Sequence, residues 1–551
     1  MHRLVIGWML VLLPVVLQSR PLQDPPIEHP SLQPQYLLIH VDGISADHLR
    51  EEWQEGRLPH LKAQFGEAGW IPDAITYLPS KTPMVVSSVR KSTPIQESPL
   101  VSWAGADRLT GQPFTGIDTF REMIRSKSRL GMANLLYGIP SLSWLNIVAT
   151  RNLPDFVSQY PTLEYYWYPI DTIGHFYGEE TYLEKIHEFD RHIGSMLEKI
   201  NPTINVILYS DHGMAFGRGL QTDEQIRERF GEDVRTASYP NIYLSEPDDP
   251  AHRGEMARRI VSETDIDFVF YLQSEGRVVG IHDHGEMVII EAPGGHRYRY
   301  GVMGQDPLGF TQAGYQGELW SDEEWLEFSY DLDYPAAPSQ IFHLLENSSA
   351  GDLVTFLEAG RFNQTDYSAE GNHGGFTRQE ASIPIFFRGP DLTMLEGRET
   401  IALNNLMKEI GSPDFDRTPR RDRHHLYGSH HLRQDEQRLG LTLSLHYRWQ
   451  LGGELHLHRD NLDDRYNTWI AGDIFRSYIA RVWVGMGLQG EMSGKTSGEF
   501  HLIHELRYRR WHFQSHFRTH SGNRYRLIFD VAPAIGIEWI NFRELGLRLR
   551  I

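Results

Sequence analysis

The stretch N-V-I-L-Y-S-D-H-G, residues 205–213, decides the fold class of this chain. Its apolar run is continuous rather than alternating, which is typical of a strand that other elements cover on both faces. The stretches Q-Y-L-L-I-H-V-D-G at 35–43 and S-I-P-I-F-F-R-G-P at 382–390 have the same character. Intervening segments such as 179–200 repeat their apolar residues with the 3.6-residue period of a helix. Residues 30–412 are therefore predicted to form an α/β domain with a mostly parallel sheet between helices.

Polar residues follow two of these strands directly. In an open α/β sheet, functional groups gather beyond the carboxyl ends of the strands. The first strand delivers Asp42 to such an end, and the strand at 205–213 delivers Asp211 and His212. A single aspartate in this place is usually a helix cap, but a carboxylate beside an imidazole offers the two ligand types that zinc takes. These three residues are candidate metal ligands.

Two further motifs supply the same ligand types. Y-P-I-D-T-I-G-H-F-Y-G, residues 168–178, carries Asp171 and His175, and their four-residue spacing lets one helical turn direct both at one ion. G-N-H-G-G-F-T, residues 371–377, carries His373 between glycines that allow a close approach of the backbone. Together with the first group, this makes three carboxylates and three imidazoles. The inventory suits two divalent ions with three protein ligands each, and zinc is the leading candidate.

The stretch I-T-Y-L-P-S-K-T-P-M-V-V, residues 75–86, runs from an apolar segment into a polar cluster that no core would favour. We interpret Thr82 as a nucleophile, because a divalent ion can lower the otherwise high pKa of a hydroxyl enough for attack on a substrate. The residues after Pro83 are expected to open a helix, whose N-terminus favours anions. The alternative is an ordinary turn after a strand.

Composition excludes several classes of protein. The chain has 551 residues, a formal net charge of −20 and no cysteine. The acidic balance argues against a general nucleic-acid-binding protein, and a negatively charged substrate would need a metal or a local basic patch. Without cysteine there are no disulfides, no thiolate nucleophiles and no cysteine zinc sites.

The N-terminal residues 1–22 have a basic start, an apolar run and small polar residues near Ser19, which is typical of an export signal. The apolar run is short for a bilayer span. An uncleaved membrane anchor is the alternative. We therefore expect an exported protein, either periplasmic or associated with an outer membrane.

The C-terminal part differs from the rest of the chain in its composition and in the period of its apolar residues. Residues 413–437 are charged and poor in apolar residues, which indicates a linker. From residue 438 to 551 apolar and polar residues alternate, which predicts an all-β domain with one-sided strands. A small outer-membrane β-barrel and a soluble β-sandwich both fit this alternation. The barrel would associate the protein with an outer membrane.

Five motifs between residues 41 and 375 occur in the order V-D-G, P-S-K-T, D-T-I-G-H, S-D-H-G-M and G-N-H-G-G. This ordered set resembles the alkaline phosphatase superfamily, in particular its type I phosphodiesterase and nucleotide pyrophosphatase branch. The resemblance implies an alkaline-phosphatase-like fold and a two-zinc hydrolase in which Thr82 attacks phosphorus, a phosphothreonine forms, and water then hydrolyses it. It also implies two ligand sets: Asp42, Thr82, Asp211 and His212 around one ion, and Asp171, His175 and His373 around the other.

The chain departs from that branch next to the nucleophile. The branch commonly has an asparagine there that holds a phosphate oxygen, whereas this chain has Met84, Val85 and Val86. Stabilisation of the oxyanion must then come from metal, backbone amides, Lys81 or a residue elsewhere. Lys81 is our candidate substrate-binding residue. The choice between phosphate monoesters and diesters stays open.

Three functional classes remain after these steps. The favoured one is a metal-dependent phosphoric ester hydrolase that acts on a small phosphorylated substrate, with no nucleic-acid partner. The second is a non-catalytic binding module on the same fold. The third is a membrane β-barrel protein whose large domain is a passenger. The intact ligand set and Thr82 favour the enzyme.

Overall fold

A computed structural model describes most of the chain as two units. One unit comprises Tyr36–Val157 and Thr162–Arg417, and the other includes the chain from Thr418 onward. The predicted export signal at 1–22 lies outside the described residues. The structure describes residues 35–126, 144–157, 160, 162–247, 249–364, 369–413, 425–431, 436–446, 449–458, 465–476, 480–491, 496–508, 511–519, 524–532, 535–540 and 544–550.

The sheet that carries the candidate ligands has five strands in the order β2-β18-β6-β1-β5. They are β1 (Tyr36–Val41), β2 (Trp70–Ile75), β5 (Thr162–Trp167), β6 (Asn205–Ser210) and β18 (Ser382–Arg388). Strand β1 pairs in parallel with β5 and β6, while β18 is antiparallel to both β6 and β2. Four strands therefore run in one direction and β18 runs in the other. The prediction of a mostly parallel sheet in an α/β fold is confirmed.

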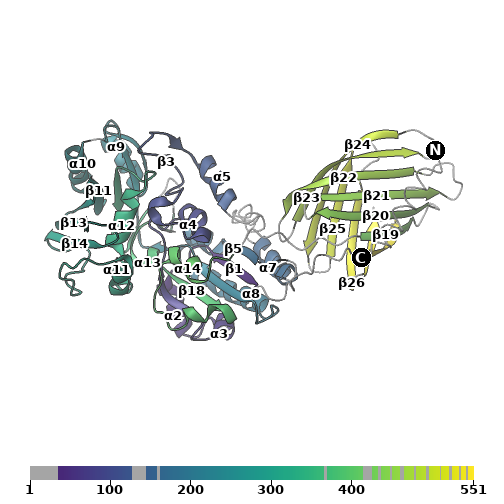
Figure 1. The fold of residues 1–551 in the computed structure, drawn as a ribbon, viewed down its shortest axis with the longest axis horizontal. Helices are drawn as coiled ribbons and strands as arrows, with labels where there is room; N and C mark the ends of the chain where they lie inside the picture. Colours follow the sequence, from purple (N-terminus) through teal and green to yellow (C-terminus); the bar gives the residue numbers. More distant parts are fainter. Residues whose placement is uncertain are drawn as a thin grey trace. The chain divides into compact units, whose positions relative to one another are not determined.

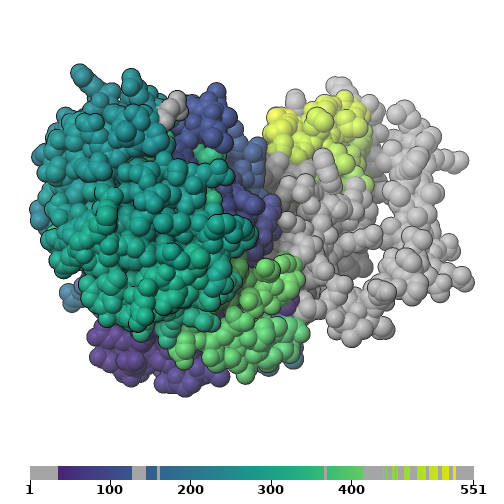
Figure 2. Space-filling view, turned by 60° about the vertical axis from the view of Figure 1, so that its left-hand side comes forward, coloured from purple at the N-terminus to yellow at the C-terminus, as the bar shows by residue number. Residues whose placement is uncertain are grey.

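Both faces of this sheet are covered, as the continuous apolar strands require. Helices α2 (Ala46–Gln54) and α3 (Pro59–Phe65) pack against β18, and α3 also packs against the long helix α8 (Pro169–Leu197). Figure 2 shows the purple N-terminal residues beside the green residues near 390, which agrees with the pairing of β2 and β18. The face of the sheet that α2 and α3 do not cover contributes to a large apolar core, which also includes residues of a second sheet.

The second sheet is antiparallel, with seven strands in the order β14-β13-β12-β11-β15-β10-β9. The sequence analysis did not predict it. Its strands are β9 (Val234–Ser238), β10 (Asn241–Leu244), β11 (Phe268–Ser274), β12 (Arg277–His282), β13 (Gly285–Glu291), β14 (Tyr298–Gly304) and β15 (Leu353–Phe356). Helix α10 (Pro250–Glu263) packs on β11 and β12, and α12 (Ala337–Glu346) packs on β11 and β14. In Figure 1 this sheet lies on the far left of the α/β unit.

Shorter elements complete the unit. The remaining helices are α4 (Thr82–Ser88), α5 (Gly116–Ser126), α7 (Trp144–Val157), α9 (Thr222–Phe230), α11 (Asp322–Ser329), α13 (Arg378–Ala381) and α14 (Leu403–Glu409). Short strands are β3 (Gly105–Ala106), β4 (Pro113–Phe114), β7 (Ala215–Phe216), β8 (Arg218–Leu220), β16 (Arg361–Asn363) and β17 (Gly371–Asn372). Single 3-10 turns occur at Val89–Lys91, Ile95–Glu97 and Pro390–Leu395. None of the described helices is long and apolar enough to cross a membrane.

The C-terminal unit is a closed barrel of ten strands (Figure 1). Each strand pairs antiparallel with the next, and β19 pairs with β28, which closes the sheet. The strands are β19 (His425–His431), β20 (Glu436–His446), β21 (Trp449–His458), β22 (Arg465–Arg476), β23 (Ala480–Glu491), β24 (Thr496–Tyr508), β25 (Trp511–Arg518), β26 (Arg524–Ala532), β27 (Ile535–Ile540) and β28 (Glu544–Arg550).

The barrel begins earlier than the sequence analysis expected. Strand β19 and the first two residues of β20 lie inside the stretch 413–437 that was interpreted as a linker, so that interpretation is wrong for residues 425–431 and 436–437. The physical reason is that strand pairing uses backbone groups, and H-L-Y-G-S-H-H forms two ladders in spite of its polar composition.

Candidate active site

The strands of the first sheet direct all candidate residues to one edge. Strands β1, β5 and β6 are parallel, so Asp42, Asp171 and Asp211 follow them at their common carboxyl edge. Strand β2 runs in the same direction and leads into the loop that ends at Thr82. Strand β18 runs the other way, so the chain enters it at this same edge, and His373 lies on the approach.

The first group of side chains forms around His212. Its Nε2 atom lies 3.2 Å from Oδ1 of Asp42, 3.5 Å from Oδ2 of Asp211 and 3.1 Å from Oγ1 of Thr82. All four residues are buried. Helix α4 begins at Thr82 with Pro83 in its first turn, which confirms the helix expected after this motif. Asp42, Asp211 and His212 are placed close enough together to hold one metal ion.

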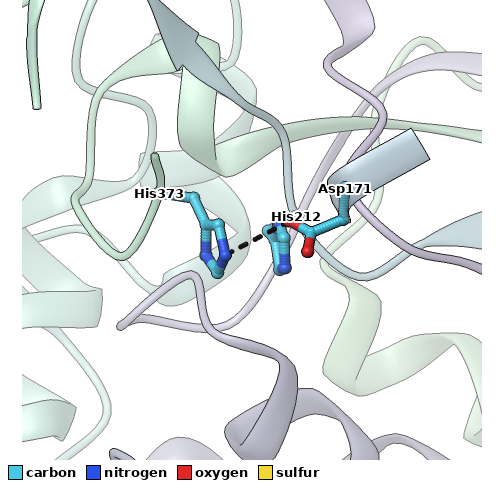
Figure 3. Close-up of side chains that lie close together, drawn as sticks. All are labelled: Asp171, His212 and His373. Carbon is cyan, nitrogen blue, oxygen red and sulfur yellow. Dashed lines mark ion pairs between the residues drawn. The ribbon is translucent and has the colours of Figure 1, made fainter. Parts of the chain in front are cut away.

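The second group forms around Asp171, in the first turn of α8. Its Oδ1 atom lies 3.2 Å from Nε2 of His175 and 3.4 Å from Nε2 of His373. The rings of His212 and His373 stack with centroids 3.5 Å apart, so the two groups adjoin. Figure 3 shows His373, His212 and Asp171 converging from three different elements. These three also form a group that could hold an ion.

All three imidazoles are held in the same way. In each, the Nδ1 atom contacts a backbone carbonyl, which can only accept a hydrogen bond, so Nδ1 must carry the proton. The acceptors are the carbonyls of Gly371 for His175 (2.9 Å), Gly213 for His212 (2.9 Å) and Ser80 for His373 (2.8 Å). In the neutral ring the Nε2 atom then has a free lone pair, and it is this atom that faces the carboxylates. This is the usual arrangement of metal-binding histidines.

Backbone geometry fixes the carboxylates. Gly43 has a φ of 78°, and a Cβ atom there would lie 2.8 Å from the Cβ of Asp171, so a side chain at this position would clash with a candidate ligand. The Oδ1 atom of Asp211 accepts hydrogen bonds from the amides of Gly43 (3.2 Å) and His212 (3.1 Å). Its Oδ2 atom is thereby directed toward the imidazoles.

Two supporting residues were missed by the sequence analysis. His40, on β1, places Nε2 3.2 Å from Oδ2 of Asp211, and Tyr166, on β5, donates its hydroxyl to Oδ2 of Asp42. Both are buried, and their rings lie 4.6 Å apart. A signal for His40 was present, because a histidine two residues before Asp42 interrupts an otherwise apolar strand. Tyr166 gave none, since tyrosine is ordinary in a strand.

The electrostatics of the site fit a cation. Burial, together with the charges of Asp171 and Asp211, raises the pKa of Asp42 to about 7. Burial also raises the pKa of Asp211. Burial alone would lower the pKa of His212, but the Asp211 and Asp42 carboxylates raise it to about 10. Three carboxylates in a dry site thus favour positive charge strongly, and divalent ions would supply it.

Lys81 and Met84–Val86 flank Thr82 in sequence. The Lys81 ammonium donates to the carbonyl of Tyr239, and the side chain passes over Gly374, where a Cβ would lie 2.6 Å from its Cε atom. Burial lowers the pKa of Lys81 to about 8. Met84, Val85 and Val86 are buried in apolar clusters, so they offer no polar group to a substrate.

The fold and the site together define an α/β protein with a buried carboxylate and imidazole centre beside a threonine hydroxyl. Residues 148–278 match the family described as type I phosphodiesterase / nucleotide pyrophosphatase. The matched segment contains Asp171, His175, Asp211 and His212, while Asp42, Thr82 and His373 lie outside it. The match confirms the predicted resemblance to the type I phosphodiesterase and nucleotide pyrophosphatase branch over this segment of the α/β unit.

Among solved structures, the chain matches human ectonucleotide pyrophosphatase / phosphodiesterase 5, with 14% identity, 68% of this chain and 94% of that chain covered, and a TM-score of 0.43. The alkaline phosphatase PafA has 10% identity, coverage of 70% and 98%, and a TM-score of 0.44. Phosphonoacetate hydrolase from Sinorhizobium meliloti has 13% identity, coverage of 69% and 95%, and a TM-score of 0.41. A comparison with curated proteins gives no significant match.

Proposed function

We propose that the α/β unit hydrolyses phosphoric esters of small molecules through a threonine nucleophile and two divalent ions, most suitably zinc. The observation that carries this proposal is the set of three imidazoles whose Nδ1 atoms are bound by backbone carbonyls and whose Nε2 atoms face shared carboxylates. Mixed nitrogen and oxygen ligands of this kind suit zinc. The ligand sets are Asp42, Thr82, Asp211 and His212 for one ion, and Asp171, His175 and His373 for the other.

When bound, the ions neutralise the carboxylates, attract the phosphate group and lower the pKa of the threonine hydroxyl. Thr82 Oγ1 then forms a bond to phosphorus while the bond from phosphorus to the ester oxygen breaks. The alcohol leaves with a proton, and water hydrolyses the phosphothreonine to free phosphate or a phosphate monoester. Oγ1 of Thr82 lies 3.1 Å from Nε2 of His212, so these two proposed ligands of the first ion are neighbours.

Ser80 is a weaker candidate for the nucleophile. Its hydroxyl donates to the carbonyl of Gly375 (2.7 Å) and accepts from the amide of Gly374 (3.1 Å). It is also fully buried. These bonds hold the loop of Thr82 against the loop of His373, which is a structural role.

The proposed substrate class rests on the ligands of two similar proteins and on the residues next to Thr82. A murine relative was solved as an inactive variant in complex with AMP, and the Sinorhizobium enzyme was solved with phosphonoacetate. For this chain we propose small phosphorylated molecules in general. Lys81 is proposed to contribute positive charge near the phosphate, because no polar side chain is available at positions 84–86.

The test compares Thr82→Ala with Ser87→Ala, which removes a buried hydroxyl from the same helix α4. Hydrolysis of p-nitrophenyl phosphate and bis-p-nitrophenyl phosphate is measured with and without a chelator, and zinc content is measured in parallel. We expect Thr82→Ala to lose at least about 100-fold in kcat with nearly normal zinc content, Thr82→Ser to keep part of the rate, and Ser87→Ala to behave like the parent. Near-normal turnover by Thr82→Ala would exclude the threonine mechanism. Zinc binding without turnover in the parent chain would favour the non-catalytic binding module.

A further inference from the structure

The barrel carries large apolar side chains on its outer face. On β22, the buried residues Asn467, Trp469 and Ala471 alternate with the exposed residues Thr468 and Ile470. Among the barrel side chains whose exposure the structure describes, the large apolar ones that are exposed lie on seven strands. They are Leu439, Leu451, Ile470, Met486, Leu488, Phe500, Leu506, Phe517 and Tyr525. The outside of the described barrel is thus rich in apolar groups, unlike the surface of a water-soluble sheet.

The inside of the barrel combines an apolar cluster of Trp469, Ala471, Trp483 and Ile503 with many polar side chains. Its buried polar side chains include Glu454, Asn467, Glu499, His501, His512, His516 and Arg526. Asn467 donates to Oε2 of Glu499 (2.8 Å), and Nδ1 of His501 lies 2.7 Å from Nε2 of His516. A soluble β-sandwich or barrel would bury the apolar stripe of each strand instead.

One ion pair crosses the interior from wall to wall. The guanidinium of Arg526, on β26, donates to Glu454, on β21, and these two strands are five steps apart around the ten-stranded ring in either direction. Arg518, on β25, reaches the second carboxylate oxygen of Glu454 at 3.9 Å. Side chains from opposite walls therefore meet in the middle of the barrel, and the interior at this level is filled.

We propose that the barrel spans a lipid bilayer of the outer-membrane type and serves as an anchor with a filled interior rather than as a pore. A closed sheet satisfies all its backbone groups without water, which a membrane-spanning structure requires. Its apolar outer stripe then contacts hydrocarbon, while the polar stripe faces inward, as in known transmembrane barrels. This inference is independent of the proposed catalytic function. It implies that the hydrolase unit is tethered to a membrane by its own chain.

The test uses the full chain, synthesised cell-free in the presence of dilauroylphosphatidylcholine vesicles and then floated in a sucrose gradient. We expect most of the protein to float with the vesicles and to remain bound after an alkaline carbonate wash. Protein that stays in the lower fraction, dissolved or aggregated, or that carbonate releases, would overturn the proposal.

Two variants test the outward stripe. Ile470→Arg places a charge at the lipid-facing position of β22, and we expect it to reduce the carbonate-resistant fraction several-fold. Leu109→Arg makes a matched change at an exposed leucine of the α/β unit, 86% accessible, and should leave that fraction unchanged. Equal behaviour of the two variants would contradict lipid contact at Ile470.

The filled interior is tested by conductance. Vesicles that carry the full chain are fused with a planar bilayer, and we expect no steady current. A stepwise, persistent conductance would show an open lumen and would contradict the crossing of the interior by Glu454 and Arg526.

Discussion

The two ring nitrogens of His212 have different partners in the candidate site. Its Nε2 atom faces Asp42, Asp211 and Thr82, while its Nδ1 atom is bound to the carbonyl of Gly213. The sequence was sufficient to name this residue as a candidate ligand, because Asp211 and His212 directly follow an apolar strand. Asp171, His175 and His373 were named from the spacing of their motifs and from flanking glycines. The sequence did not predict the partners of these ligands, because the contact of His40 with Asp211 and the hydrogen bond from Tyr166 to Asp42 depend on which strands are neighbours.

At the residue scale we predict an effect of His40 on metal affinity. His40→Phe keeps an aromatic ring between Tyr166 and Tyr209 but removes the contact with Asp211. Removal of such a partner typically weakens metal binding by about 10- to 100-fold. Competition between the protein and a fluorescent zinc chelator measures this, with circular dichroism to check the fold.

The control for this prediction is His192→Phe, which changes a half-buried histidine that lies beside the ring of Trp167, away from the candidate ligands. Zinc affinity should not change in this variant. An unchanged affinity in His40→Phe as well would mean that His40 serves only packing.

At the scale of elements, the sequence identified β1, β6 and β18 from their continuous apolar runs. The same runs occur in the second sheet, where Phe268, Val269, Phe270 and Tyr271 are all buried on β11. Periodicity reports that a strand is covered, but it does not report which strand it pairs with, so the second sheet was not separated from the first. The opposite direction of β18 was hidden for the same reason.

The junction of α11 and α12 gives a prediction of pH dependence. His343, on α12, has its Nε2 atom 3.1 Å from both carboxylate oxygens of Asp322, at the start of α11. Burial alone would lower the pKa of His343, but Asp322 and Glu346 raise it to about 9. Because the folded pKa is raised, the stabilisation is complete below the ordinary histidine pKa of about 6.5 and is lost as the pH rises through about 9.

We therefore expect His343→Gln to lower the free energy of unfolding by about 1 kcal/mol at pH values near 6, since the partly exposed partners screen the interaction. The difference between variant and parent should vanish near about pH 10. Thermal unfolding of both proteins across this pH range measures it. If His343→Gln lowers the free energy of unfolding by the same amount at every pH, the role of His343 is packing instead.

At the scale of the whole molecule, the chain combines an α/β unit with a unit that is a closed β-barrel. The change in composition near residue 413 was visible in the sequence, as was the two-residue period of apolar residues after it. That period is common to sandwiches and barrels, and the choice was decided by the pairing of β19 with β28, more than 100 residues apart in sequence. Local patterns carry no information about such a closure.

Metal content is a property of the whole protein and can be measured directly. We expect about two divalent ions per chain in active protein by plasma emission spectroscopy, as the ligand count implies. His373→Ala should lower both the metal content and the activity, because it removes a nitrogen that faces Asp171. Active protein with one ion or none would exclude the two-ion proposal, and full zinc occupancy in His373→Ala would remove His373 from the site.

The position of β18 also has a consequence for biosynthesis. This strand is the last of its sheet to leave the ribosome, yet it is inserted between β2 and β6 and joins β2 to the rest of the sheet. A nascent chain that lacks β18 therefore lacks the strand that pairs β2, which leads to Thr82, with β6. Non-local pairing of this kind is slow to form. The α/β unit should consequently stay inert until β18 has emerged and paired between β2 and β6.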